Sequence, residues 1–406
     1  MSDEPRPDVR DHDDGDQPRA DTLYLDNAAT TFPKPEAVYA AADAFYRTGG
    51  GNADRGRYPL ARGAAEVIAR TRTKLTAWLG ARGGDQIILA PSATIALNQV
   101  ILGSGLRAAE TAYVTPFEHN SALRPLEHLR ATAGIAVREL PFDRQTWQLD
   151  AADAAAMLRA EPPALLVVSH ASNVCGYLPP VAAIVRLARA ANPACVVVVD
   201  GAQAAGLYPL DLQAGAIDYY VFSGHKALYG PYGIAGFVLC SERRPAPILF
   251  GATGTHSDSV AMPLEAPSAY EPGSQNAWAA AGLDAALDWL AAQGRAAVVA
   301  PAETAAHAML RRLGALPGVQ TYAPAAEHWM GIVAFTSDRL APGALADALA
   351  ERGIAVRAGL HCAPWAHRWL GTLAGGGAVR VSTSYFTPPS AVETLESALR
   401  DILARG

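Results

Sequence analysis

The sequence predicts an α/β protein, with a mostly parallel sheet flanked by helices and a smaller α+β unit after it. Three observations predict this fold. From Thr22 onward, short apolar runs alternate with longer amphipathic stretches, the pattern of repeated strand–helix units. Runs such as Cys195–Val199 are apolar throughout, which is typical of strands buried on both faces of a parallel sheet. After Asn276 the sequence becomes Ala-rich and helical with fewer strands, which indicates a second unit.

The first part of the chain contains the alternating elements. Continuous apolar runs predict strands at Gln86–Ala90, Thr111–Thr115, Ile135–Leu140, Ala164–Ser169, Cys195–Val199, Tyr219–Phe222 and Ala235–Leu239. Amphipathic stretches predict helices at Ala61–Leu79, Thr94–Leu102, Ser121–Ala133, Ala151–Arg159 and Val181–Ala191. Parallel strands need a crossover connection, so this alternation favours a parallel sheet.

The part of the chain after Asn276 is less regular. An Ala-rich stretch predicts helix to about Leu313, and a final helix begins at Ser390. Three short strands are predicted between them, at Gly331–Phe335, Ile354–Arg357 and Ala378–Ser382. We therefore expect a large domain at residues 22–282 and a small domain at residues 283–406, preceded by an acidic tail at residues 1–21.

The net charge of −6 is concentrated at the N-terminus of this 406-residue chain. Residues 1–21 hold eight of the 39 acidic residues and little that can be buried, which predicts a disordered tail. The remainder is nearly neutral, so we expect no nucleic-acid or membrane partner. Neither a membrane span nor a signal segment is recognisable. The four cysteines form no C-x-x-C pair, which fits a reducing compartment and a cytoplasmic protein.

Lysine is rare in this chain, because Lys34, Lys74 and Lys226 are the only lysines among 33 basic residues. Lys34 lies in a Pro-Lys-Pro turn and Lys74 on a predicted helix, and we expect arginine to be able to replace both. Lys226 follows a predicted strand, and Asp200 ends another strand of the same sheet. Residues just beyond the carboxyl ends of parallel strands line the ligand crevice, so both are expected to face one site.

The chemistry of these two side chains indicates a cofactor. A primary amine forms an imine with an aldehyde, whereas a guanidinium does not. An aspartate can hold a pyridinium N–H and thereby make the ring an electron sink. Taken singly, Lys226 is better explained as a surface lysine and Asp200 as a helix N-cap. Together, at two strand ends, they indicate pyridoxal 5'-phosphate.

The motif Asp200-x-x-Gln203, followed by Ser-Gly-His-Lys226, resembles the class V aminotransferase superfamily of fold-type I pyridoxal-phosphate enzymes. More narrowly, it resembles the cysteine desulfurase and selenocysteine lyase branch, and within it the second group of cysteine desulfurases. The resemblance runs from Tyr24-Leu-Asp-Asn-Ala-Ala to the C-terminal helix. It implies a large cofactor-binding domain, a small domain that carries the catalytic cysteine loop, and a homodimer with shared active sites.

The resemblance also implies which residues bind the phosphate. Ala93 and Thr94 stand at a predicted helix start, where free backbone N–H groups attract an anion, and Thr94 adds its hydroxyl. Ser223 and His225 match further phosphate ligands. Ser274 matches a hydroxyl that crosses the dimer interface to the partner's phosphate.

Other residues are implied at the cofactor ring. His119 resembles the histidine that stacks on the pyridine ring and moves protons during catalysis. Asn173 resembles the asparagine near the ring oxygen, and Gln203 is a second donor there. Asp200 and Lys226 take the roles that their chemistry indicates.

Cys362 lies in a Gly-containing segment after a short predicted strand. The segment resembles the Arg-x-Gly-His-His-Cys-Ala motif of the second desulfurase group, with Leu360 in place of its first histidine. A thiolate is a strong nucleophile, and nearby Arg357, His361 and His367 are expected to favour it.

The commoner fate of a cysteine is to be a small buried hydrophobe, which Cys195 and Cys240 fit. A zinc site at His361, Cys362 and His367 lacks a second ligand cluster, so we predict no metal.

The resemblance implies an L-cysteine desulfurase. Arg380 would clamp the substrate carboxylate, with Asn173 nearby, and Lys226 would move the Cα proton. Cys362 would then attack the substrate sulfur, leaving L-alanine and a persulfide whose sulfur passes to an acceptor protein or thiol. The alternatives are a selenocysteine lyase or another class V enzyme, such as a cysteine C–S lyase, aminotransferase or epimerase. A non-catalytic pyridoxal-phosphate-binding scaffold ranks last, because Lys226, Asp200 and Cys362 are all present.

Overall fold

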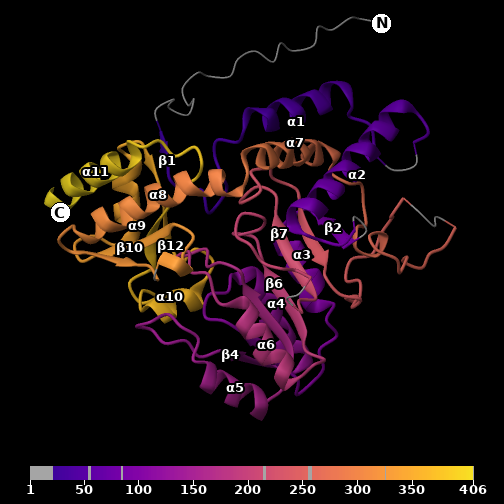
Figure 1. Ribbon diagram of the computed structural model, residues 1–406, viewed down its shortest axis with the longest axis horizontal. Helices are drawn as coiled ribbons and strands as arrows, with labels where there is room; N and C mark the ends of the chain where they lie inside the picture. The colour runs from indigo at the N-terminus through magenta and orange to yellow at the C-terminus, as the bar shows by residue number, and fades with distance from the viewer. Residues whose placement is uncertain are drawn as a thin grey trace, which may run out of the picture.

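The computed structural model describes residues 22–53, 56–83, 86–213, 216–254, 258–324 and 326–405. The predicted acidic tail, residues 1–21, lies outside them. Figure 1 shows two groups of elements, with the C-terminal helices and strands at the left and the larger sheet with its helices at the right and below. None of the helices in the described ranges is long and apolar enough to cross a bilayer.

The larger sheet has seven strands in the order β2-β8-β7-β6-β5-β3-β4. Their bounds are β2 Ile87–Ala90, β3 Thr111–Val114, β4 Ala136–Glu139, β5 Pro163–Ser169, β6 Val196–Asp200, β7 Tyr219–Ser223 and β8 Ala235–Leu239. β8 is antiparallel to both of its neighbours, and the other pairs are parallel. The predicted mostly parallel sheet is therefore confirmed, and each of the seven strands predicted in this part of the chain is present.

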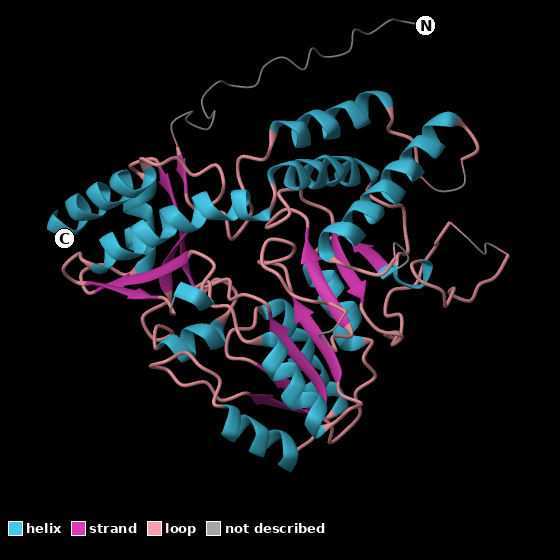
Figure 2. Cartoon of the chain, in the orientation of Figure 1, coloured by secondary structure: helices cyan, strands magenta, loops and turns pink. Residues whose placement is uncertain are grey.

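Helices cover both faces of this sheet, as Figure 2 shows. Because strand residues alternate between faces, Val197 and Val199 of β6 belong to one core and Val198 to the other. The first core includes buried residues of α2, α6 and α7, and the second includes those of α3 and α4. The bounds are α1 Glu36–Thr48, α2 Pro59–Leu79, α3 Ala93–Leu102, α4 Asn120–Ala133, α5 Ala151–Ala160, α6 Val181–Ala191 and α7 Ala277–Gln293.

A second, antiparallel sheet has the strand order β12-β13-β10-β9. Its strands are β9 Val319–Tyr322, β10 Ile332–Ser337, β12 Arg357–Gly359 and β13 Ala378–Ser382. Buried residues of three helices pack on this sheet, namely α8 Arg295–Gly314, α9 Pro342–Ala350 and α11 Ala391–Arg405. A fourth helix, α10 Pro364–Leu370, follows the loop that carries the cysteine. Short 3-10 helices span Ser268–Tyr270 and Ala326–His328. The expected smaller α+β unit is present.

Several details differ from the sequence prediction, which did not include α1, β9, α9 or α10. The predicted strand Ile354–Arg357 divides into β11, Ile354–Ala355, and the start of β12. β11 pairs in parallel with β1, Leu23–Tyr24, so the N-terminal strand belongs to the second group of elements. The long Ala-rich helix is interrupted at Gly294, whose φ of 79° lies in the left-handed region that glycine favours.

The predicted domain boundary at residues 282/283 falls inside α7. Residues of this helix on both sides of that point, from Ala277 to Leu290, are buried in the core of the larger sheet. The helix ends before Gly294, where the chain passes to α8. The division of the chain into two folding units stays a prediction, and the packing favours a boundary near Gly294.

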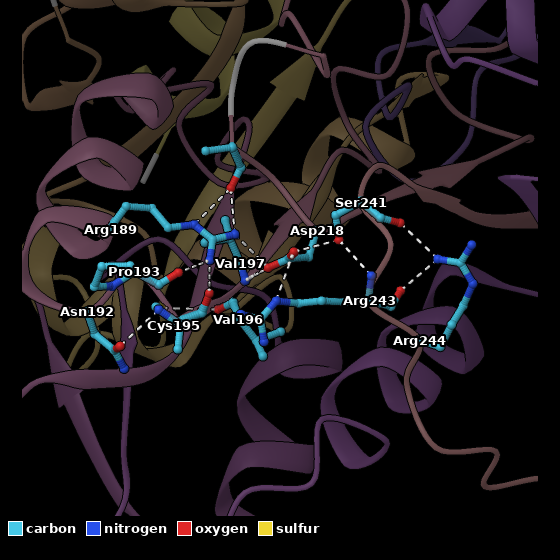
Figure 3. Close-up of polar contacts among 12 residues, drawn as sticks. Arg189, Asn192, Pro193, Cys195, Val196, Val197, Asp218, Ser241, Arg243 and Arg244 are labelled. Atoms are coloured by element: carbon cyan, nitrogen blue, oxygen red, sulfur yellow. Dashed lines mark hydrogen bonds and ion pairs between the residues drawn. The ribbon is translucent and has the colours of Figure 1, made fainter.

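The two ends of the larger sheet differ in chemistry. At one end, Ser169, Asp200 and Ser223 are the last residues of β5, β6 and β7, so polar side chains gather at the carboxyl ends of adjacent strands. At the opposite end, Asp218 lies just before β7 in a network of ion pairs and hydrogen bonds (Figure 3).

Candidate active site

One cavity at the carboxyl ends of β5, β6 and β7 brings together nine of the ten residues predicted to bind the cofactor. Five chain segments far apart in sequence supply its walls, because the parallel strands all end at this edge. The lining residues are Ser92, Ala93, Thr94, Leu97, His119, Ser121, Ser169, Ala171, Asn173, Asp200, Ala202, Gln203, Ser223, His225 and Lys226.

The N-terminus of α3 forms one wall of this cavity. Ser92 is the N-cap, and its hydroxyl accepts the backbone N–H of Ile95 at 3.2 Å. The N–H groups of the first helical turn, which include Ala93 and Thr94, have no acceptor within the helix and favour an anion. The Thr94 hydroxyl lies 2.8 Å from that of Ser121, so α4 fixes its position.

Asp200 and Lys226 both line the cavity, as their strand-end positions predict. Asp200 Oδ1 accepts the backbone N–H of Ala202 at 2.9 Å, and burial raises the pKa of this carboxyl. Burial lowers the pKa of Lys226 to about 8, while the negative charge of Asp200 acts in the opposite direction. A substantial part of the Lys226 amine is therefore neutral near physiological pH, as imine formation requires.

His119 is held in one tautomer. It is the N-cap of α4, and its Nδ1 accepts the backbone N–H of Ser121 at 3.0 Å. Burial, followed by the positive charge of Lys226, lowers the pKa of His119 to about 4. The ring is therefore neutral at pH 7, and its proton is on Nε2.

Asn173 connects the cavity to two other parts of the site. Its side-chain Nδ2 donates to the carbonyl oxygen of His361 at 2.7 Å, beside Cys362. Its backbone oxygen accepts from Arg380 Nη1 at 2.8 Å, and Arg380 Nη2 forms an ion pair with Asp26 Oδ1 at 2.5 Å. The arginine predicted to bind a carboxylate is thus already fixed by a carboxylate of its own chain.

Cys362 differs from the other three cysteines, which are buried, because it is exposed. It lines a second cavity together with Thr94, His119 and Ser121, which also line the first. His361 and Cys362 have φ values of 49° and 55°, left-handed conformations that cost residues other than glycine about 1–3 kcal/mol each. The backbone N–H of Asn120 donates to the Cys362 carbonyl oxygen at 2.7 Å and holds this turn.

The sequence predicts that His361 and His367 favour the Cys362 thiolate, which a positively charged ring would do. Burial lowers the pKa of His361 to about 2 and that of His367 to about 4, so both rings are neutral at pH 7. This part of the prediction is wrong because both side chains are buried beside the positive charge of Arg380. Within the described ranges, no group of three or more His, Cys, Asp or Glu side chains is arranged to hold a metal ion.

Three of the residues predicted to bind the cofactor have surroundings that the sequence did not indicate. His225 stacks on Tyr232 with ring centroids 4.5 Å apart, and Gln203 Nε2 donates to the Ala28 carbonyl oxygen at 2.8 Å. Ser274 does not line the cofactor cavity and is exposed in another pocket of the same chain. Its predicted contact with a partner's phosphate stays a prediction.

The sequence reasoning missed Lys34. Its Nζ donates to Thr31 Oγ1 at 2.8 Å, to the His225 carbonyl oxygen at 2.9 Å and to Thr30 Oγ1 at 3.4 Å. Burial lowers its pKa to about 7, and no carboxylate is among these partners. The Pro-Lys-Pro turn therefore fixes the segment that carries Lys226, and lysine rarity was the one signal that pointed to it.

Glu118, beside His119, was also missed. Its carboxyl accepts from the Thr115 hydroxyl at 2.6 Å, and from the Ser169 backbone N–H and hydroxyl at 2.9 and 2.6 Å. Burial raises its pKa to about 7. It ties the His119 segment to the end of β5, next to Asp200.

The residues present fit pyridoxal 5'-phosphate. Three buried polar atoms around the site have no hydrogen-bond partner in the described structure, namely Asn173 Oδ1, His225 Nδ1 and Arg380 Nε. Buried polar atoms are normally satisfied, so these atoms indicate that a polar ligand completes the site. A helix N-terminus for a phosphate, a carboxylate for a ring nitrogen and an amine for an aldehyde are all present.

Comparisons with known proteins identify the family. The family model described as Aminotransferase class-V matches residues 23–395. Cysteine desulfurases of Escherichia coli O157:H7 (strain EC4115 / EHEC) and Cronobacter sakazakii are 33% and 34% identical to this chain, and each alignment covers 84% of both proteins. The chain therefore belongs to the class V aminotransferase family, whose members use pyridoxal 5'-phosphate. Within the family, the similarity is to the cysteine desulfurase branch.

Solved structures agree with this assignment. A cysteine desulfurase of Thermococcus onnurineus NA1, in its apo form, superposes with a TM-score of 0.86 at 27% identity. An Escherichia coli cysteine desulfurase with an S-sulfonic acid gives 0.83 at 30% identity. Both alignments cover 95% of each chain, which supports the fold-type I architecture.

Proposed function

We propose that this protein is a pyridoxal-phosphate-dependent L-cysteine desulfurase that carries a persulfide on Cys362. When bound, the cofactor supplies an electron sink that weakens the bonds at the substrate Cα. One observation carries the proposal beyond the family: the exposed Cys362 lies in a cavity that shares His119, Thr94 and Ser121 with the cavity of Lys226.

The cofactor would be held by the nine predicted residues of that cavity, with Ser274 contributed to the partner subunit's site. Ala93, Thr94, Ser223 and His225 would bind the phosphate. Asp200 would pair with the ring nitrogen, because a carboxylate stabilises a pyridinium N–H. His119 would stack on the ring, and Asn173 and Gln203 would be donors to its oxygen.

Substrate binding is assigned to Arg380. Its guanidinium is buried and held by Asp26 and the Asn173 carbonyl, while Nε has no partner among the described residues. A preorganised guanidinium loses little freedom when it receives a carboxylate. Asn173, which contacts Arg380 through its backbone oxygen, completes this carboxylate pocket.

The proton at the substrate Cα is assigned to Lys226, and a hydrogen bond to the reacting system is assigned to His119. The neutral amine of Lys226, with its pKa of about 8, accepts the Cα proton. His119 carries its proton on Nε2, since its Nδ1 accepts the Ser121 N–H, and the neutral ring donates a hydrogen bond from Nε2.

The sulfur step uses the Cys362 thiolate. Its Sγ forms a bond to the substrate sulfur, the substrate C–S bond breaks, and the bonding electron pair stays with the carbon fragment. Protonation of that fragment gives L-alanine. An acceptor thiol, free or on a protein, then attacks the outer sulfur and restores Cys362.

Further properties belong to the same proposal. We infer a homodimer, supported by the exposed apolar side chains of Phe250 and Leu264. We infer a cytoplasmic location from the four unpaired cysteines, and a division into a cofactor domain and a smaller domain that carries the Cys362 loop.

The substitution Cys362→Ala tests the proposal. Purified wild-type enzyme with pyridoxal phosphate and L-cysteine should release L-alanine, and Cys362→Ala should not. Cys240→Ala, at a buried cysteine, is the matched control and should retain activity.

Other outcomes assign other reactions. Selenide release that persists in Cys362→Ala would indicate a selenocysteine lyase. Pyruvate or a changed stereocentre in place of alanine would indicate elimination or epimerisation. A wild-type protein that binds the cofactor but turns over no amino acid would be a scaffold.

A further inference from the structure

Three buried side chains beside Cys362 form a continuous chain of hydrogen bonds. Thr372 Oγ1 lies 2.7 Å from His367 Nδ1, and His367 Nε2 lies 3.1 Å from His361 Nδ1. His361 Nε2 lies 3.4 Å from the Arg357 carbonyl oxygen. All three side chains are buried, with exposed fractions of 4%, 0% and 6% for Thr372, His367 and His361.

The Arg357 end of this chain of hydrogen bonds determines which atom is the donor in each bond. The Arg357 carbonyl can only accept, so His361 Nε2 carries a proton and His361 Nδ1 is a lone pair. His367 Nε2 must therefore donate to His361, which leaves His367 Nδ1 as an acceptor. The Thr372 hydroxyl is the remaining donor. It lies 2.7 Å from His367 Nδ1 and 3.4 Å from the His367 carbonyl oxygen, and the shorter contact identifies Nδ1 as its acceptor.

The chain has consequences for the backbone of the cysteine loop. His361 and Cys362 are consecutive residues in the left-handed region, and neither is glycine. The His361 carbonyl is held by Asn173 Nδ2, and its ring is held by His367. The carbonyl group of the peptide unit before Cys362 and the side chain of the residue that begins this unit are thus both held, and the ring cannot rotate without breaking the chain.

This arrangement excludes another role for His361. Both ring nitrogens are occupied, one by His367 and one by the Arg357 carbonyl. No lone pair remains to accept a proton from the thiol. His361 therefore acts on Cys362 through the backbone.

We propose that the Thr372 hydroxyl, through His367 and His361, is the positioning element that holds the Cys362 sulfur in its reactive orientation. The inference rests on the proposed function for its effect on turnover, and its effect on the conformation of the loop is independent of that function. Thr372, His367 and His361 are positioning residues, and Cys362 is the catalytic one.

Thr372→Val tests the proposal, because it keeps the shape of the side chain and removes the donor. Alanine release should fall about tenfold, the factor that corresponds to one lost buried hydrogen bond. The affinity for L-alanine, read from the absorbance of the bound cofactor, should change by less than about twofold, because Arg380 is untouched. Thr372→Ser, which keeps the hydroxyl, should retain the wild-type rate. Thr394→Val, at an exposed threonine on α11, is the matched control.

A second readout does not depend on desulfurase activity. The rate of Cys362 alkylation by iodoacetamide, followed by mass spectrometry, should change at least about threefold in Thr372→Val and in His367→Phe. Wild-type alkylation in both variants, or equal impairment of Thr372→Ser and Thr372→Val, would overturn the proposal. Absence of alanine release by the wild-type protein would contradict the proposed function alone, and alkylation would still decide the inference.

Discussion

Asp200 and Asp218 are two buried carboxylates at opposite ends of adjacent strands, and their surroundings have little in common. Asp218 accepts hydrogen bonds from the Val197 backbone N–H and the Ser241 hydroxyl, and it forms ion pairs with Arg189 and Arg243 (Figure 3). The Asp200 carboxylate accepts one hydrogen bond, from the Ala202 backbone N–H, and within the described ranges no arginine or lysine forms an ion pair with it.

The difference separates a structural carboxylate from a chemical one. Asp218 has its lone pairs satisfied by groups of its own chain, so it ties β6, β7 and the segment after β8 together. Asp200 is buried with unused hydrogen-bonding capacity, and burial raises its pKa. A buried group that the chain leaves incompletely paired is available to a ligand.

Asp200→Asn should lower turnover and leave stability nearly unchanged, whereas Asp218→Asn should do the opposite. The loss of turnover in Asp200→Asn is the largest effect expected. Asp200→Asn should lower turnover about 10²- to 10³-fold, because it removes an electrostatic partner of the reacting system. Its free energy of unfolding should change by less than about 1 kcal/mol. Turnover and urea denaturation measure the two quantities.

Asp218→Asn should instead lower the free energy of unfolding by about 3 kcal/mol, because it leaves Arg189 without its buried partner. Turnover per folded molecule should stay near the wild-type value. The comparison fails if Asp218→Asn loses turnover while folded, or if Asp200→Asn loses mainly stability.

The Asp200 side of this contrast could be predicted from the sequence, whereas the network around Asp218 was not. Asp200 and Lys226 follow apolar runs, and the carboxyl ends of parallel strands converge for a topological reason, so local pattern was sufficient. The pairing of Asp26 with Arg380 could not be predicted, because it joins residues more than 350 positions apart. The same holds for β1 and β11, two-residue strands that are too short to carry a periodic signal.

The neutral histidines show another limit of sequence reasoning. A histidine beside a cysteine in a sequence suggests a charge partner, but its protonation depends on burial and on what its nitrogens contact. His361 and His367 are buried against each other, which the linear order does not reveal. Lys34 was misjudged for the same reason, since its three acceptors are contributed partly by the distant Lys226 segment.

The pH dependence of pyridoxal-phosphate capture should distinguish Lys226, at the carboxyl ends of the strands, from an ordinary surface lysine. Imine formation needs the neutral amine, so capture of pyridoxal phosphate by the cofactor-free protein should rise about tenfold per pH unit below the Lys226 pKa. The rate should level near pH 8, the value to which burial lowers that pKa. Stopped-flow absorbance measures it, and a rate that still rises tenfold per unit above pH 9 would contradict the assignment.

The sign of the stability effect follows from the same pKa. The folded Lys226 has a pKa of about 8 and the unfolded one about 10.5, so the unfolded chain binds more protons between these values. The contribution of Lys226 to the stability of the cofactor-free protein therefore rises with pH through this window. Lys226→Met should remove that part of the pH dependence.

Lys34→Arg should have the smallest effect. Three acceptors converge on the Lys34 ammonium, and a planar guanidinium cannot direct its donors to all of them. Cofactor affinity, measured by absorbance titration, should fall about fivefold. Lys74→Arg is the matched control, because Lys74 pairs with the carboxylates of Asp284 and Asp288, which an arginine also satisfies. Equal affinities for Lys34→Arg and Lys74→Arg would show that Lys34 does not shape the Lys226 segment.

The central claim is that Cys362 receives sulfur from L-cysteine. Mass spectrometry of the peptide that contains Cys362, after incubation of the enzyme with L-cysteine and no reductant, tests it most directly. One additional sulfur atom is expected on Cys362, formed together with L-alanine, and none on the buried Cys175, Cys195 or Cys240. L-Alanine released while Cys362 stays unmodified under the same conditions would contradict it.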